Sequence, residues 1–250
     1  MQPNTVPLYA DWSFWAVVVA AIAILLSQLP PVHQVVRRAK LTMELYTRAH
    51  ITHKVGNPNV QLHIILSNVG GRSIRIRGMA LKVRRDGKDL AALPAQNYLQ
   101  NPNDERTVLF TTFSLSPKEE WAHIVNFLNY FARPHEKKYR AAEVALKRDI
   151  AEKKKIPENE KVLVHAEAVF VEPFNQMFDA WFIWQPGEYE LRIEVDTAAE
   201  RARIAKTYRF TLFESDSDEL LAAKEDFRLG DGIYWNTGNH PGVLVQLVEA

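Results

Sequence analysis

The stretch Gly-Glu-Tyr-Glu-Leu-Arg-Ile-Glu-Val, residues 187–195, decides the fold class. Apolar side chains occupy every second position from Tyr189 to Val195, and charged side chains fill the positions between them. This alternation is typical of a strand with one face in a core and the other in solvent. The same period of two recurs at residues 41–46, 60–67 and 208–212. The sequence therefore predicts a mainly β protein.

A register change marks the predicted strand over residues 73–85. The apolar positions are even before Gly78 and odd after it: Ile74, Ile76, Met79, Leu81 and Val83. A shift of one residue turns every side chain to the other face, so we expect a β-bulge at Gly78 that restores the buried face. Asp86-Gly87 then predicts a tight hairpin turn into the next strand, residues 88–93.

Helical patterns interrupt the strands. Ser116-Pro117-Lys118-Glu119 has the form of a capping box, and apolar residues with helical spacing follow from Trp121 to Phe131. A second, charged helix is expected from about His135 to Lys155. These two helices form a predicted insertion at about residues 116–156. Further strands are predicted at 108–113, 162–171 and 177–184 and a short helix at 218–227, while residues 230–250 are left unplaced.

Two strand entries resemble those of immunoglobulin-like β-sandwiches of bacterial surface and membrane proteins. The first is the strand–Asn68-x-Gly70–strand stretch, and the second is Pro186-Gly187-Glu188-Tyr189-Glu190-Leu191. The resemblance implies an antiparallel immunoglobulin-like sandwich over residues 41–113 and 160–214. The chain departs from that pattern in its helical insertion and in having no cysteine. The resemblance concerns the fold and carries no function.

The segment Trp12–Leu29 contains no ionisable side chain. Its 18 residues span about 27 Å as a helix, close to the thickness of a bilayer core. Trp12 and Trp15 at one end, and Pro30-Pro31 at the other, fit a single transmembrane helix. A signal peptide and a buried core helix are the alternatives. The prediction divides the chain into an N-terminal tail and anchor, 1–36, and a β-sandwich domain, 37–250.

The orientation of this predicted anchor follows from the charges beside it. Arg37, Arg38 and Lys40 follow the segment, and no basic residue precedes it. The positive-inside rule then places the N-terminus outside and the C-terminal domain in the cytoplasm. Membrane lipid is accordingly an expected partner through the anchor. The opposite topology would make the domain an extracytoplasmic binding module.

The formal net charge of +1 hides an uneven distribution. Residues 37–100 hold 12 Lys and Arg against three acids, a net of +9, whereas residues 101–250 have a net of −7. Seven cations of the basic half are candidates for contact with an anionic surface: Arg72, Arg75, Arg77, Lys82, Arg84, Arg85 and Lys88. There are two alternatives to such a contact. In the first, these cations form a solvated face that is partly paired with acids. In the second, which the pattern supports less, they bind nucleic acid.

The sequence offers no motif for catalysis. It has no cysteine, no Gly-x-Ser-x-Gly, no phosphate-binding loop and no His-Glu-x-x-His. His50 and His53 are three residues apart, and on a strand such side chains face opposite sides and do not converge on one ion. We therefore expect no catalytic residue, no metal and no cofactor.

These observations favour a membrane-tethered, non-enzymatic binding or scaffold protein, such as an accessory subunit of a membrane complex. Trp121 and Trp181 are the candidate contacts for a protein partner. The alternative is a hydrolase-like enzyme of unrecognised type with its site between the helical insertion and the sheet. The sequence leaves the partner, the process and the oligomeric state open.

Overall fold

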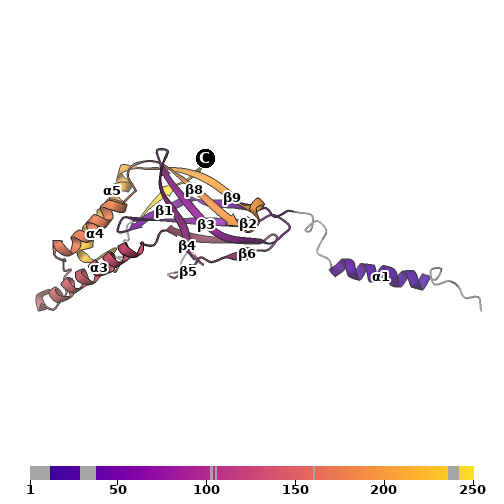
Figure 1. Cartoon of the computed structure of the whole chain (residues 1–250), viewed down its shortest axis with the longest axis horizontal. Coiled ribbons are helices and arrows are strands. Elements are labelled where there is room, and N and C mark those ends of the chain that lie inside the picture. Colours follow the sequence, from indigo (N-terminus) through magenta and orange to yellow (C-terminus); the bar gives the residue numbers. More distant parts are fainter. Residues whose placement is uncertain (1–11, 29–37, 102–103, 105, 160, 236–241) are drawn as a thin grey trace, which may run out of the picture.

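The computed structural model describes residues 12–28, 38–101, 104, 106–159, 161–235 and 242–250. Within them the chain forms one eleven-stranded antiparallel sheet, and most of its helices are gathered at one end, with α1 beyond the other (Figure 1). The long strands are β1 (Leu41–Lys54), β2 (Asn57–Asn68), β3 (Ile74–Arg85), β4 (Lys88–Leu99), β7 (Glu120–Leu128), β8 (Gly187–Thr197) and β9 (Ile204–Leu212). The short ones are β5 (Thr107–Leu109), β6 (Phe113–Leu115), β10 (Gly242–Gln246) and β11 (Val248–Glu249).

The sheet curls until its two ends nearly meet. Its main strand order is β10-β1-β2-β7-β4-β3-β8-β9-β11. Strands β10 and β11 are separated only by Leu247, so one C-terminal segment pairs with β1 at one end of the order and with β9 at the other. The result is a nearly closed, barrel-like sheet. The predicted immunoglobulin-like sandwich is therefore wrong, because a sandwich needs two separate sheets packed face to face.

The predicted bulge and hairpin are confirmed. The pairing of β3 with β8 shifts register between Ile76 and Gly78, and buried apolar side chains continue on both sides of the shift. Asp86 and Gly87 both have positive φ, 48° and 76°, as a two-residue hairpin turn requires.

The predicted helical insertion is only half correct. Residues 120–128 form strand β7, which pairs with β2 and β4, and are not a helix. The charged helix is real and is α3 (Arg133–Lys154). The predicted strands at 162–171 and 177–184 are also wrong, because Ala168–Trp181 forms helix α4. The remaining helices are α5 (Glu214–Ala222) and the short turns η2 (Pro157–Asn159), η3 (Glu200–Ala202) and η4 (Ala223–Leu229).

The sheet and the helices are held together by two apolar cores. The larger core fills the inside of the curled sheet, with Ile51, Leu62 and Phe127 among its buried members. The smaller one, which we call the helix-end core, joins α3, α4 and η4 to the β1–β2 turn. Its fully or nearly buried members include Val55, Tyr139, Leu146, Phe174, Phe178, Phe227 and Ile233.

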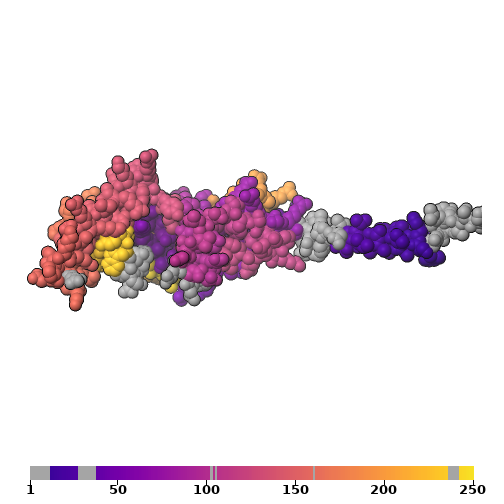
Figure 2. Space-filling view, turned by 90° about the horizontal axis from the view of Figure 1, so that it is seen from below, coloured from indigo at the N-terminus to yellow at the C-terminus, as the bar shows by residue number. Residues whose placement is uncertain are grey.

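The N-terminal helix α1 (Trp12–Gln28) has 17 residues and exposes most of its apolar side chains. In Figures 1 and 2 it lies beyond the end of the sheet opposite the helices. Among the described residues, no helix is long and apolar enough to cross a membrane. This finding contradicts the predicted single-pass membrane protein with an outside N-terminus and a cytoplasmic domain. The predicted segment continued to Leu29, which lies outside the described residues.

Candidate functional site

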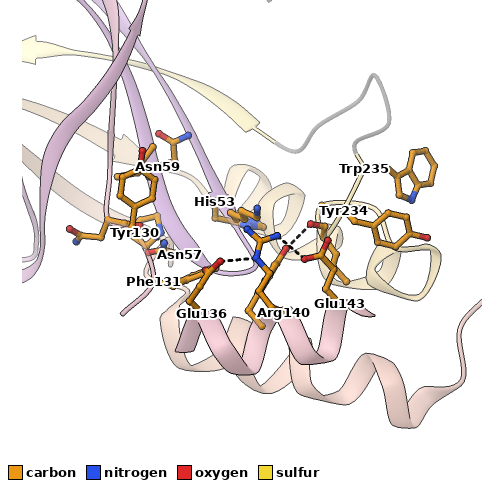
Figure 3. Close-up of a pocket in the computed structure, with 17 residues that line it drawn as sticks. His53, Asn57, Asn59, Tyr130, Phe131, Glu136, Arg140, Glu143, Tyr234 and Trp235 are labelled. Carbon is orange, nitrogen blue, oxygen red and sulfur yellow. Dashed lines mark hydrogen bonds and ion pairs between the residues drawn. The ribbon is translucent and has the colours of Figure 1, made fainter. Parts of the chain in front are cut away.

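A cavity of about 770 Å³ opens where the helices meet the end of the sheet (Figure 3). One wall is the β1–β2 hairpin and the end of β7, and the opposite wall is α3. The segment 232–235 closes a third side, and Figure 2 shows the C-terminal residues in yellow next to the helices. The lining contains aromatic rings, amides and charged groups.

An ion-pair network on α3 forms the charged side of the cavity. The Arg140 guanidinium lies 2.7 Å from Glu136 and 3.1 Å from Glu143, and the Lys147 ammonium lies 2.6 Å from the second oxygen of Glu143 (Figure 3 shows the two Arg140 pairs). Spacings of three and four residues bring these groups to one helix face. Burial by itself would raise the pKa of Glu143, but the hydrogen bonds and charges of Lys147 and Arg140 outweigh it and lower that pKa.

Tyr139 forms the floor between this network and the helix-end core. Its hydroxyl donates a hydrogen bond of 2.6 Å to the Ile233 carbonyl, and its ring packs edge-on against Phe174. Burial, followed by the charge of Glu143, raises the pKa of Tyr139 far above the ordinary tyrosine value. The Lys54 ammonium lies 5.2 Å from the ring centroid on the cavity side. Tyr139 therefore stays protonated and acts as a rigid platform.

His53 touches the cavity but is held on both ring nitrogens. Its Nε2 donates to the Leu220 carbonyl at 2.9 Å, and its Nδ1 accepts from the Gly56 amide at 3.4 Å. A carbonyl can only accept, so this pattern assigns the neutral tautomer with the proton on Nε2. The ring also makes edge-to-face contacts with Phe178 and Phe182, which stack on each other. Its role is to tie the β1–β2 turn to the helices.

Amide side chains supply the neutral polar groups of the cavity. Asn57 donates to the Asn129 carbonyl at 2.7 Å, and Asn129 donates to the Ala92 carbonyl at 2.9 Å. Asn59 differs, because its Oδ1 is buried and has no hydrogen-bond partner among the described residues. A buried acceptor without a donor costs about 1–3 kcal/mol. A ligand N–H or O–H that reached Asn59 would remove that cost.

A smaller cavity of about 260 Å³ lies next to the first. The two share Tyr234 and Trp235, and the second is lined mainly by apolar side chains such as Ile150, Leu163 and Leu229. Trp235 is fixed at the junction by a 3.0 Å hydrogen bond from its indole N–H to the Leu229 carbonyl. We call the two neighbouring cavities together the groove along α3: it is polar near Glu136 and apolar near Ile150, and the Lys147 ammonium lies 4.8 Å from the ring centroid of Tyr234, which lines both cavities.

The groups of the cavity that could serve as acids or bases are already engaged. His53 uses both ring nitrogens, the two glutamates are paired with Arg140, and the Tyr139 hydroxyl is bonded to a carbonyl. The described part of the chain also contains no group of three or more His, Asp or Glu placed to hold a metal ion.

The seven cations predicted to contact an anionic surface divide into two groups. Lys82 lies 2.9 Å from Glu194, Arg84 lies 2.8 Å from Asp89, and Arg85 lies 3.7 Å from Asp86. The other four form no ion pair with any residue that the structure describes: Arg72, Arg75, Arg77 and Lys88. Lys82 and Arg84 thus lie beside glutamates of β8, Arg84 also being 3.5 Å from Glu190, whereas Arg85 lies beside its sequence neighbour Asp86.

The two predicted partner contacts are mostly covered. Trp121 lies on β7 and not on a helix, and it stacks on Phe113 at 4.9 Å against the sheet core. Trp181, the last residue of α4, stacks on Phe131 at 4.9 Å. Because Phe131 lines the cavity, Trp181 supports the cavity wall from behind.

Sequence reasoning missed most of the residues that build the cavity. Glu136, Tyr139, Arg140 and Glu143 lie at spacings of three and four within a helix that was predicted, so their common face could have been recognised. Tyr234 and Trp235 lie in the segment 230–250, which periodicity left unplaced. No local signal connects Lys54 or Asn59 with them, since that proximity depends on the whole fold.

Titration of Glu143 gives a first prediction. A carboxyl whose folded-state pKa is lowered adds stability above its unfolded pKa of about 4.3, and that stability is lost as pH falls through the folded value. We expect Glu143→Gln to lower the melting temperature at neutral pH and to have little effect below the folded pKa. Glu158→Gln, at an exposed position of η2, is the control and should have little effect throughout. Equal losses for Glu143→Gln at both pH values would contradict the prediction.

Comparison of the chain with protein-family models and with curated proteins finds no match.

Proposed function

We propose that the chain is a non-enzymatic binding protein whose groove along α3 receives an extended, acidic segment of a partner protein. One observation carries the proposal: the acid–base groups of the main cavity are held in hydrogen bonds or ion pairs, whereas two groups remain for a ligand. These are the Lys54 ammonium, which forms no ion pair with the described residues, and the exposed Tyr130 ring.

The length of the groove favours an extended peptide. Its α3 wall runs from Glu136 in the first cavity to Lys154 in the second. These 18 helical steps correspond to about 27 Å. A strand-like peptide rises about 3.3 Å per residue, so roughly eight residues would fill the groove.

The chemistry of the lining favours acidic and apolar residues in the segment. Lys54 and Lys154 line the groove and form no ion pair with the described residues, so each can meet a carboxylate. Ile150, Leu163 and Leu229 at the other end suit apolar side chains. The faces of Tyr130 and Trp235 offer contact area at low entropic cost.

Selection from a random octapeptide display library tests this proposal. The affinity of the most enriched peptide is then measured. We expect peptides that combine acidic and apolar residues. Tyr130→Ala and Trp235→Ala should each weaken the selected peptide roughly thirtyfold, as central aromatic contacts do. Replacing the peptide's acidic residues by amides should also weaken binding.

Tyr46→Ala is the matched control. Tyr46 is 59 % exposed and Tyr130 is 64 % exposed, but Tyr46 lies on β1 beside His63 and does not line the groove. Its removal should leave peptide affinity unchanged. The proposal fails if no peptide is enriched, or if Tyr46→Ala weakens the selected peptide as much as Tyr130→Ala does.

A further inference from the structure

The end of the sheet opposite the helices carries a cluster of cations, which we call the basic end. Its six members are exposed: Arg38, Lys40, Arg72, Arg75, Arg77 and Lys118. They come from three segments that are distant in sequence. None of the six forms an ion pair with a residue in the described ranges.

A buried asparagine holds these segments together. Asn68, fully buried at the end of β2, donates through Nδ2 to the carbonyls of Arg72 and Leu115, both at 2.9 Å, and its Oδ1 accepts from the Gly70 amide at 3.0 Å. Its backbone carbonyl accepts from the Lys118 amide at 2.9 Å.

The strand that leads into the sheet is fastened to the same loop. The Val69 and Gly70 amides donate to the Lys40 carbonyl at 3.0 and 3.1 Å, and the Gly71 amide donates to the Arg38 carbonyl at 3.3 Å. The backbones that carry Arg38, Lys40, Arg72 and Lys118 are therefore fixed relative to one another. A preformed cluster of cations loses less entropy on binding an anion than side chains on mobile loops would.

The register of β3 and β8 explains why the cations at this end stay uncompensated. On the other side of the Gly78 bulge, Lys82 and Arg84 face the β8 carboxylates Glu194 and Glu190. Before the bulge, Arg75 lies opposite Ser114 of β6, which carries no charge. The Arg75 carbonyl accepts a hydrogen bond from the Ala198 amide. Asp196, the last carboxylate of β8, forms an ion pair with Arg203 at 2.8 Å.

Two carboxylates follow Lys118 in the sequence, and six cations against these two anions leave the basic end with an excess of positive charge. Glu119 accepts from the Ser116 amide at 2.6 Å, and Glu120 accepts from the Ser67 hydroxyl at 3.1 Å. Like charges gathered on one surface repel, and a multivalent anion relieves that repulsion. We propose that the basic end binds clustered phosphate groups, independently of the groove along α3.

Inositol hexakisphosphate titrated into the full-length chain by calorimetry is the first arm of the test. We expect binding that weakens as salt rises, because each phosphate contact releases counterions. The double variant Arg75→Ala/Arg77→Ala should lose about tenfold in affinity and show a shallower salt dependence.

The double variant Lys82→Ala/Arg84→Ala is the matched control. It removes the same number of cations from the same face of the same strand, but from positions already paired with acids. We expect its affinity for inositol hexakisphosphate to stay within about twofold of the parent. Equal losses in the two double variants would overturn the proposal, since only the total charge would then matter.

The second arm distinguishes the source of the phosphate. Vesicles of phosphatidylcholine with and without a phosphatidylinositol phosphate are compared for the parent and for both double variants. Phosphate-dependent vesicle binding that is lost in Arg75→Ala/Arg77→Ala supports a headgroup as the ligand, and binding of inositol hexakisphosphate alone supports a free polyphosphate. Failure of both probes, or tighter binding of a single-stranded RNA oligonucleotide than of either, would overturn the proposal.

Discussion

Gly56→Ala should destabilise the protein by about 3 kcal/mol or more, because two penalties add at this turn. Gly56 joins β1 to β2 with φ at +80°, a conformation that costs an L residue about 1–2 kcal/mol. A Cβ there would also lie 2.6 Å from the Phe178 carbonyl oxygen and 2.8 Å from the Phe178 Cα. Both contacts are with backbone, so no side-chain rotation relieves them.

Gly87→Ala separates the two penalties. Gly87 has nearly the same φ, +76°, but a Cβ there meets nothing within 4 Å. We expect Gly87→Ala to cost only the conformational part, about 1 kcal/mol. Urea unfolding followed by circular dichroism measures both variants. Similar losses would mean that α4 does not press against the β1–β2 turn, which would also bring the geometry of the groove into doubt.

Asn68→Ala should cost about 3 kcal/mol, since it removes the shared donor of two carbonyls and leaves a void. The Leu115 carbonyl would lose its bond to Nδ2 in a buried place, and the Arg72 carbonyl would lose its bond in a partly buried one. The loop that carries Arg72 would then be less firmly fixed to the segment 38–40. Stability and affinity for inositol hexakisphosphate should therefore fall together.

Asn57→Ala is the control for this substitution. Asn57 also donates to a carbonyl, that of Asn129, but the bond is exposed and water can replace it. We expect a cost below about 1 kcal/mol and no change in phosphate affinity. The interpretation of Asn68 as the organiser of the basic end would be refuted if Asn68→Ala left both the unfolding midpoint and the phosphate affinity unaltered.

Local sequence patterns predict the strands whose two faces differ in polarity. β8 alternates from Tyr189 to Val195, and the register change at Gly78 predicts the bulge. Assignment from alternating polarity fails for β7, because Ile124 and Leu128 on its outer face are also apolar and partly buried. A strand with apolar residues on both faces has no period of two, and its spacing imitates a helix.

The closure of the sheet and the groove depend on contacts between distant segments. β10 pairs with β1, and periodicity placed neither its register nor its neighbour. The groove needs Lys54, Tyr139 and Trp235 in one place, and each comes from a different part of the chain. Whether a basic residue of β3 forms an ion pair likewise depends on which strand lies beside β3. Residue spacing within β3 does not show which strand that is.

The pairing of β1 with β10 also has a consequence during synthesis. Thr52 is opposite Gly242, so β1 emerges from the ribosome about 190 residues before its partner, an interval of roughly 10–40 s at ordinary elongation rates. Through that interval the backbone donors and acceptors along the outer edge of β1 lack the hydrogen-bond partners that β10 later supplies. An exposed strand edge is a template for intermolecular pairing, so this is the period in which a nascent chain most needs protection by a chaperone.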